Sequence, residues 1–336
     1  MSKFLITGGA GFIGSNYLHY VVNNYVDDFF LCIDDLTYAG NYDNIKELEK
    51  NTNFKFMKFN ICDDKKLLDI FKREKFDYVV NFAAETHVDN SIKNPNIFFE
   101  TNIMGTINLL NSVKFMNESS DHKIIRYHQV STDEVYGELP LDHPELLFNE
   151  NSKIIPSSPY SASKASADLI TLAYHKTYNI PITISRCSNN YGPYQYPEKF
   201  IPLMIKNALN NKKIPIYGTG ENIRDWIYVY DHIVGIDLIV RNGENGEVYN
   251  IGGNFEISNI NVAKKILRCL NKSEHLISFV KDRPGHDKRY AIDSSKIKNK
   301  LGWKCQYNFD EGLNKTVVLQ LMWHHLYIQK AINPLK

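Results

Sequence analysis

The sequence predicts an α/β fold, in which a doubly wound parallel sheet carries a smaller mixed α/β lobe. In the first half of the chain, short apolar runs alternate with amphipathic stretches, an order typical of parallel sheets covered by helices. Beyond Asn190, prolines and glycines interrupt this order. We therefore expect the sheet domain in residues 1–186, with returning segments near 225–250. Residues 187–336 are expected to form mainly the lobe, interleaved with the sheet domain.

The expected elements follow the apolar pattern along the chain. Short apolar-rich runs predict strands at 4–7, 29–33, 54–59, 78–82, 124–130 and 182–185. Amphipathic segments predict helices at 14–24, 65–75, 102–116 and 159–178. The last of these has the clearest start, because Ser158 precedes Pro159 and these residue types are favoured at the cap and at the first helical position.

Composition and charge exclude several classes of protein. The 336 residues include 39 Lys and Arg against 38 Asp and Glu, a net charge of +1. This balance argues against a protein that binds nucleic acid mainly through phosphate contacts. No apolar run reaches the length of a membrane-spanning helix, and an apolar strand so near the N-terminus leaves no room for a signal peptide.

The cysteines and histidines show no spacing that is typical of a disulfide framework or a metal site. The five cysteines are scattered without C-x-x-C spacing, a pattern expected for reduced thiols in a cytoplasmic protein. His324 and His325 are adjacent and therefore point in different directions on a helix, and no third ligand is evident. We expect no metal site and no membrane association.

A glycine-rich turn follows the first predicted strand and opens the first helix. Gly8, Gly11 and Gly14 have the spacing G-x-x-G-x-x-G, which allows a tight turn, a close approach of a pyrophosphate, and anion binding by the helix N-terminus. Asp34 lies 20 residues after Gly14, directly after the second strand. A carboxylate there accepts hydrogen bonds from ribose hydroxyls and repels a 2′-phosphate, so NAD is favoured over NADP. Asp63 either contacts the adenine amino group or is a structural surface residue.

Tyr160 and Lys164 stand four residues apart on the predicted helix 159–178, so both lie on one face. An ammonium about 4 Å from a phenol contributes on the order of 4 kcal/mol at an effective dielectric constant of about 20. This equals roughly three pKa units, enough to lower the pKa of a phenol from about 10 to near neutrality. Tyr160 is therefore a candidate base, with Lys164 lowering its pKa.

These motifs together resemble the extended short-chain dehydrogenase/reductase family, which has a Rossmann-like fold. Within it the chain resembles the dTDP-glucose 4,6-dehydratases over almost its whole length. The resemblance rests on segments 7–14, 82–89, 131–137, 156–164, 187–193, 224–226 and 282–290. Thr132-Asp133-Glu134 matters most, because this triplet distinguishes the dehydratases from sugar epimerases. One departure is Asp35, where these dehydratases usually carry a basic residue.

The resemblance implies a reaction without net redox change. The sugar is oxidised at carbon 4 by NAD, water is lost across carbons 5 and 6, and the hydride returns to carbon 6. Tyr160 would take the 4-hydroxyl proton with the help of Lys164, while Thr132 orients that oxygen. Glu134 would remove the carbon 5 proton and Asp133 would protonate the leaving hydroxyl. Opposite roles require separated pKa values, so we expect a protonated Asp133; the alternative for this pair is a solvated acidic turn.

The resemblance also implies the remaining contacts and partners. Arg224 and Arg283 are candidates for the diphosphate, because guanidinium groups bind phosphate oxygens in pairs. The cofactor contacts are expected to include Gly8, Gly11, Phe12, Ile13, Gly14, Asp34, Asp63, Ala83, Ala84, Tyr160 and Lys164. The substrate contacts are expected to be Glu85, Asn189, Arg224, Asn250, Arg283, His286 and Tyr290. The helices 102–116 and 159–178 resemble those of a four-helix homodimer interface.

Three rival functions stay open at this point. The first is a UDP-glucose 4,6-dehydratase, because thymine and uracil differ by one methyl group, which discriminates by only about 1–3 kcal/mol. A nucleotide-sugar 4-epimerase would use Tyr160 and Lys164, but it has no use for Asp133 and Glu134. A noncatalytic NAD-sensing or scaffold protein could keep the same fold.

Overall fold

A seven-stranded parallel sheet forms the centre of the computed structural model, which describes the backbone of residues 1–332 and the side chains of residues 1–322. In spatial order its strands are β10 (Glu247–Ile251), β6 (Ile182–Cys187), β5 (Arg126–Thr132), β4 (Tyr78–Asn81), β1 (Lys3–Thr7), β2 (Phe29–Asp34) and β3 (Phe54–Lys58). The strand order reverses between β1 and β4, which is where open α/β sheets bind ligands. The predicted α/β fold is confirmed.

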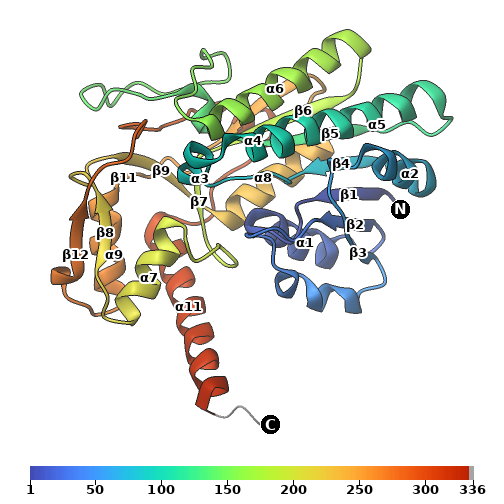
Figure 1. Cartoon of the computed structure of the whole chain (residues 1–336). Coiled ribbons are helices and arrows are strands. Elements are labelled where there is room, and N and C mark those ends of the chain that lie inside the picture. Colours follow the sequence, from blue (N-terminus) through green and yellow to red (C-terminus); the bar gives the residue numbers. More distant parts are fainter. Residues whose placement is uncertain (333–336) are drawn as a thin grey trace.

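Helices cover both faces of this sheet (Figure 1). One face packs against α1 (Phe12–Asn24) and α8 (Val229–Asn242), with α10 (Ser295–Leu301) beside α8. The other face packs against α2 (Asp64–Glu74), α5 (Gly105–Ser119) and α6 (Pro159–Tyr178). Each helix buries an apolar stripe against strands that are apolar on both faces, which is the core that the alternating sequence pattern predicts.

The helix α6 begins where the sequence predicts. The Ser158 Oγ accepts a hydrogen bond from the Ser161 N–H at 3.1 Å, and the Ser161 Oγ accepts one from the Ser158 N–H at 3.0 Å. Pro159 occupies the first turn, where its missing N–H costs nothing. Asn179 ends the helix with φ +53°, a conformation that Asn tolerates.

The predicted helix 102–116 is wrong at its start. Three short segments precede α5: α3 (Val88–Lys93), α4 (Pro95–Phe98) and a π-helical turn, η3 (Phe99–Met104). Asn102 lies in this turn, where its amide accepts from the Glu85 N–H at 2.8 Å and donates to the Glu85 oxygen at 3.0 Å. These contacts hold the chain that leaves β4 against the helix, and such tertiary contacts are invisible in an apolar pattern.

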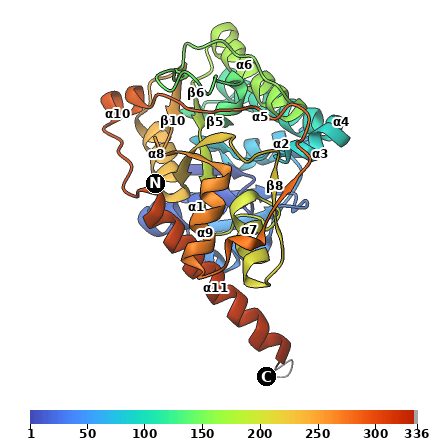
Figure 2. The ribbon, with the colours of Figure 1, turned by 90° about the vertical axis from the view of Figure 1, so that its left-hand side faces the viewer.

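The lobe contains two small sheets. The first joins β7 (Asn189–Tyr191), β9 (Ile223–Tyr228) and β11 (Glu256–Ser258), and the second pairs β8 (Ile214–Tyr217) with β12 (Ile277–Val280). They pack with α7 (Phe200–Leu209), α9 (Asn259–Cys269) and the beginning of α11 (Phe309–Ile332). The far part of α11 extends away from the body in both views (Figures 1 and 2).

Residues after the lobe's first strands return to the large sheet. α8 covers one of its faces and β10 pairs with β6 along five residues, from Glu247 with Thr183 to Ile251 with Cys187. The boundary that we place at residue 186 stays a prediction. In the part of the chain that the structure describes, we find no helix that is both long enough and apolar enough to cross a membrane.

Candidate active site

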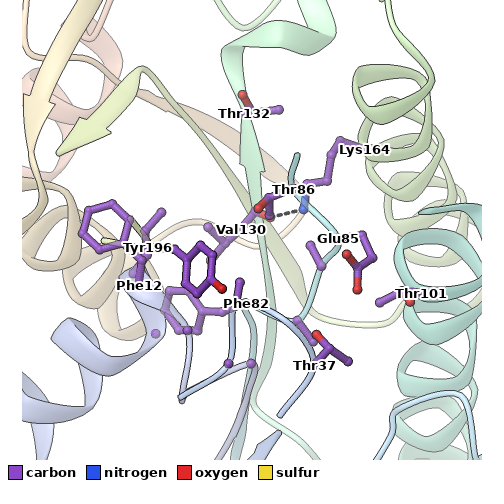
Figure 3. Close-up of a pocket in the computed structure, with 18 of the residues that line it drawn as sticks. Phe12, Thr37, Phe82, Glu85, Thr86, Thr101, Val130, Thr132, Lys164 and Tyr196 are labelled. Carbon is purple, nitrogen blue, oxygen red and sulfur yellow. Dashed lines mark hydrogen bonds between the residues drawn. The ribbon is translucent and has the colours of Figure 1, made fainter. Parts of the chain in front are cut away.

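A cavity of about 310 Å³ lies at the carboxyl ends of β1, β4, β5 and β6 (Figure 3). It brings together the glycine-rich turn after β1, the chain after β4, the end of β5 and the start of α6. The predicted residues in its wall are Gly8, Gly11, Phe12, Ile13, Gly14, Asp34, Ala83, Ala84, Glu85, Thr132, Asp133, Glu134, Tyr160, Lys164 and Asn189. Asp63, Arg224, Asn250, Arg283, His286 and Tyr290 lie outside this wall.

Two glycines of the glycine-rich turn, Gly8 and Gly14, have no room for a side chain. Gly8 has φ +69°, and a Cβ on it would lie 2.5 Å from the Ala83 nitrogen. A Cβ on Gly14 would lie 2.4 Å from the Gly8 oxygen. The turn therefore packs directly against the chain that leaves β4, and it presents its main chain to the cavity. This arrangement fits a dinucleotide whose pyrophosphate approaches main-chain N–H groups.

Two carboxylates lie beside this turn. Asp34 ends β2; its Oδ2 accepts from the Ala10 N–H at 2.9 Å and its Oδ1 from the Leu36 N–H at 2.8 Å. Burial raises the pKa of Asp34, and these two hydrogen bonds act in the opposite direction. Asp35 stands where the dehydratases usually carry a basic residue. Its carboxylate accepts a hydrogen bond from the Asn60 Nδ2 at 2.8 Å, and it also lines the cavity. Both acids would repel a 2′-phosphate.

Tyr160 and Lys164 both line the cavity from the first turns of α6. Lys164 Nζ donates to the main-chain oxygen of Val130 at 2.7 Å (Figure 3). Burial raises the pKa of Tyr160 well above its ordinary value, and the charges of Glu134, Cys187 and Asp133 raise it further. The predicted fall of the Tyr160 pKa to near neutrality is therefore wrong in this structure, because burial and these three neighbouring charges set its net direction.

The acid–base segment is a single 3₁₀ turn, η4 (Asp133–Tyr136), at the end of β5. The Thr132 Oγ1 caps it by accepting from the Glu134 N–H at 3.3 Å. Burial, followed by the charges of Glu134 and Asp225, raises the pKa of Asp133 well above its usual range. Burial also raises the pKa of Glu134, while the charges of Arg283 and Arg224 lower it. Asp133 is buried and Glu134 is half-buried, so this segment is not the solvated acidic turn of the alternative interpretation.

The two arginines lie behind this turn. Arg224 donates to the main-chain oxygens of Ile223 at 2.7 Å and Asp287 at 2.9 Å, and its guanidinium lies 4.3 Å from the centre of the Tyr290 ring. Arg283 pairs with Asp89 at 3.4 Å. Its Nε is buried without a partner among the described residues. The charges of both arginines lower the pKa of Glu134, although both residues lie outside the cavity wall.

His286 joins the same region from the loop that precedes Tyr290. Its Nδ1 lies 2.6 Å from Asp282 Oδ1, and its ring packs edge-on against Tyr217 at 6.0 Å. Tyr217 OH donates to Asp89 Oδ2 at 3.1 Å, beside Arg283. The lobe thus places an aromatic ring, an imidazole and two guanidinium groups on one side of η4.

Two predicted site residues make structural contacts. Asp63 caps α2, because its Oδ1 accepts from the Lys66 N–H at 3.3 Å and its other oxygen pairs with Lys66 Nζ at 2.9 Å. Asn250 is fully buried; its Oδ1 accepts from Tyr136 OH at 2.8 Å and its Nδ2 donates to the Phe148 oxygen at 3.1 Å. Neither residue belongs to the cavity wall, and the predicted adenine and nucleotide contacts of these two residues stay predictions.

The sequence analysis missed several cavity residues from segment 187–199. Cys187, Asn190, Gln195, Tyr196 and Lys199 all line the cavity. Lys199 Nζ donates to the Thr86 oxygen at 2.9 Å, and its charge also lowers the pKa of Glu134. Two signals were available: the proximity of these residues to Asn189 in the sequence, and the place of segment 187–193 in the family resemblance.

Four polar atoms in this wall are buried without a partner in the described part of the chain. They are Ser131 Oγ, Asp133 Oδ2, Asn189 Oδ1 and Gln195 Oε1. Orphaned buried polar atoms are costly in a folded protein, and their place in the cavity suits a polar ligand. Among residues 1–322, no three His, Cys, Asp or Glu side chains are placed to hold a metal ion. The side chains of His324 and His325 lie outside the described residues.

Comparisons with known proteins agree with this geometry. The family model described as GDP-mannose 4,6 dehydratase matches residues 5–316. A dTDP-glucose 4,6-dehydratase of Escherichia coli is 48% identical over 337 residues, covering 94% of this chain and 92% of the relative.

Solved structures of two dehydratases are also similar to this chain. The dTDP-glucose 4,6-dehydratase of Bacillus anthracis, in complex with NAD, has a TM-score of 0.87 and 46% identity, covering 96% of this chain and 97% of that chain. The enzyme of Streptomyces venezuelae has a TM-score of 0.88 and 41% identity over 94% of this chain and 96% of that chain. The chain therefore belongs to the family of nucleotide-sugar 4,6-dehydratases that includes these dTDP-glucose 4,6-dehydratases.

Proposed function

We propose that the protein is an NAD-dependent dTDP-glucose 4,6-dehydratase, a hydro-lyase that forms the 4-keto-6-deoxy sugar nucleotide. One observation carries the proposal: a single cavity contains the glycine-rich turn, Asp34, the pair Tyr160 and Lys164, and the buried turn that holds Asp133 and Glu134. The first three features suit any oxidation by a dinucleotide. The buried acid–base pair is the additional feature that an elimination needs.

The residues present fit NAD. The glycine-rich turn would hold the pyrophosphate, Asp34 the ribose hydroxyls, and Asp35 would add to the rejection of a 2′-phosphate. The structures of two relatives contain NAD. When bound, NAD⁺ supplies a hydride acceptor and a positive charge to the cavity that Tyr160 lines. That charge would oppose the upward pKa shift that burial imposes on the phenol.

Oxidation at carbon 4 would use Tyr160 as the base. The phenol has to lose its proton to accept one from the 4-hydroxyl, and Lys164 keeps a positive charge at the adjacent end of β5. Thr132 lies at the end of the same strand and would orient the sugar oxygen. Oxidation comes first because the carbon 5 proton becomes acidic only next to a ketone.

Elimination would follow on the turn η4. Glu134 would remove the carbon 5 proton, and nearby cations favour its charged form. Asp133 would protonate the departing 6-hydroxyl, and its raised pKa favours the protonated form that this role needs. Arg224, Arg283, His286 and Tyr290 would bind the diphosphate and nucleotide from the lobe, with Asn189 and Glu85 at the sugar.

A product analysis tests the proposal. The purified protein is incubated with dTDP-glucose, and the mass spectrum of the product is recorded. Loss of one water supports dehydration, whereas an unchanged mass with an altered sugar identifies a 4-epimerase. Absence of turnover with any nucleotide sugar would favour the noncatalytic alternative. A comparison of kcat/KM for dTDP-glucose and UDP-glucose then decides the nucleotide, for which the relatives favour thymidine.

We also propose a homodimer and a cytoplasmic location. α5 and α6 lie side by side (Figure 1), joined by a bond from Tyr174 OH to Asn111 Oδ1 at 2.9 Å. Exposed apolar side chains gather on and beside them, including Phe99, Met104 and Leu169. Sedimentation of Leu169→Glu should show a monomer, while the equally exposed control Ile155→Glu stays dimeric. The five free cysteines support the cytoplasm.

A further inference from the structure

A buried network lies behind the acid–base turn and involves residues that the mechanism above does not use. Its centre is Arg186 on β6, whose side chain is 2% exposed. Arg186 Nε pairs with Asp168 Oδ2 at 2.9 Å, and Asp168 is fully buried. Asp168 lies on α6, four residues after Lys164 and therefore on the same helix face. The ion pair thus joins β6 to the helix that carries Tyr160 and Lys164.

The second arm of the network reaches the acid–base turn. Arg186 Nη1 donates to Tyr136 OH at 3.0 Å, and the hydroxyl donates to Asn250 Oδ1 on β10 at 2.8 Å. Tyr136 is the last residue of η4, two positions after Glu134, and is 2% exposed. Its ring stacks on Phe148 at 5.1 Å. The Tyr136 hydroxyl therefore has both a donor and an acceptor and is held from two strands.

The turn η4 is consequently fixed at both ends by different groups. Thr132 Oγ1 caps its beginning, and the Tyr136 hydroxyl anchors its end. Directly after it, Gly137 has φ +90°, and a Cβ there would lie 2.4 Å from the Ile155 oxygen. Asp133 and Glu134 lie between these anchors, so their side chains keep one position only while both anchors hold.

Stability alone explains this network poorly. A buried ion pair costs about as much in desolvation as it gains in attraction, and apolar replacements are often neutral. A network that joins α6, β6, β10 and η4 does define the position of the acid–base pair relative to Tyr160. Because displacement of a reacting group by about 1 Å can slow a reaction roughly 100-fold, such positioning has a large kinetic effect.

We propose that Arg186, Tyr136 and Asn250 are positioning residues for elimination, which hold Asp133 and Glu134 in register with Tyr160 on α6. This inference rests on the proposed function. It predicts a selective defect: oxidation, which uses Tyr160, Lys164 and Thr132, continues, while elimination slows. The oxidised sugar and the reduced cofactor then accumulate together on the protein.

Tyr136→Phe tests the proposal, because it removes one oxygen and keeps the ring on Phe148. In single turnovers of the holoenzyme with dTDP-glucose, we expect oxidation within about twofold of wild type and elimination slowed roughly 10- to 100-fold. The absorbance of reduced nicotinamide should therefore rise and persist. The matched control is Tyr127→Phe, since Tyr127 is also fully buried and its hydroxyl donates to Gln129 Oε1 at 2.5 Å outside this network.

Asn250→Leu provides the second variant, and it carries the test if Tyr136→Phe does not fold. It removes the acceptor of the same hydroxyl, so it should give the same defect, and the double variant should be no worse than either single one. The inference would be overturned by any of three results. Elimination could run at the wild-type rate in both variants, oxidation and elimination could slow equally, or reduced nicotinamide could accumulate in Tyr127→Phe. If wild type removes no water, the proposed function itself fails, and this result is separate from any difference between variants.

Discussion

Lys164 and Val130 are joined by a hydrogen bond of 2.7 Å from the side-chain Nζ to the main-chain oxygen. The bond connects α6, four residues after Tyr160, to β5, two residues before Thr132. Burial lowers the pKa of Lys164, and the charges of Asp168 and Cys187 raise it. One ammonium therefore both links the two catalytic elements and supplies positive charge to the cavity.

Lys164→Met should lose both effects. Without the cation the phenol of Tyr160 keeps a higher pKa, so less of it is deprotonated at neutral pH. We expect oxidation to slow by about 100-fold or more at pH 7 and to recover partly as pH rises. The measurement is the rate of nicotinamide reduction against pH. The control Lys176→Met, at the exposed end of the same helix, should behave like wild type. If the pH profile of nicotinamide reduction in Lys164→Met matches that of wild type, Lys164 does not have this role.

The acid–base pair predicts a bell-shaped pH dependence for elimination. Glu134 acts deprotonated and its pKa is raised, so elimination is lost as pH falls through that raised value. Asp133 acts protonated and its pKa is raised further, so elimination is lost as pH rises through it. Because the two groups interact, the two limbs belong to the pair.

Glu134→Gln should stop elimination while oxidation continues, with a loss of about 100-fold or more. Release of water is followed by mass spectrometry of the product. The control is Glu138→Gln, an exposed residue of the following segment whose carboxylate accepts from the Lys288 N–H at 3.0 Å. Turnover at the wild-type rate in Glu134→Gln removes Glu134 from its role.

Asp225 predicts a pH-dependent stability. Burial raises its pKa from 3.8 to about 7, so the folded state binds the proton more tightly than the unfolded state. Its contribution is fully present below the unfolded pKa and is lost as pH rises through about 7. Asp225→Asn keeps an acceptor for the Phe255 N–H, which Asp225 binds at 2.8 Å.

The variant should match wild type near pH 4 and be more stable at pH 8 by on the order of 2–4 kcal/mol. Thermal unfolding at both pH values measures this difference. The exposed control Asp43→Asn should leave the pH dependence unchanged. The stability of Asp225→Asn is compared with that of wild type at each pH. If the difference is no larger at pH 8 than at pH 4, the buried charge of Asp225 does not cause the pH dependence.

Gly8 and Gly302 provide a matched pair of alanine substitutions. Their φ angles are +69° and +70°, so a side chain is strained by roughly 1–2 kcal/mol at either position. Only at Gly8 would the Cβ also meet another chain segment, 2.5 Å from the Ala83 nitrogen; at Gly302 nothing lies within 4 Å. We expect Gly8→Ala to lose bound cofactor and Gly302→Ala to retain it. Cofactor content after purification measures this, and equal contents contradict the role of the turn.

Much of the site could be predicted from local patterns. The glycine spacing, the acid after the second strand, and Tyr160 with Lys164 each depend on residues close together in sequence. Asp63 and Asn250 are harder to assign, because their residue types suit both binding and structure. Asp63 caps a helix that begins at the next residue, and Asn250 receives a hydrogen bond from Tyr136, 114 residues away. No local pattern distinguishes these roles.

By itself the sequence determined the parallel sheet, its covering helices and the cofactor turn, because strand periodicity, caps and glycine geometry are local properties. The acid–base triplet was identified by its resemblance to the dehydratases. Only the tertiary structure decided which groups share an environment. It placed the buried Asp133 beside the half-buried Glu134, turned Lys164 toward Val130, and brought Lys199, Arg224 and Arg283 near the same turn. Desolvation and charge depend on distance in space, and distant segments set that distance.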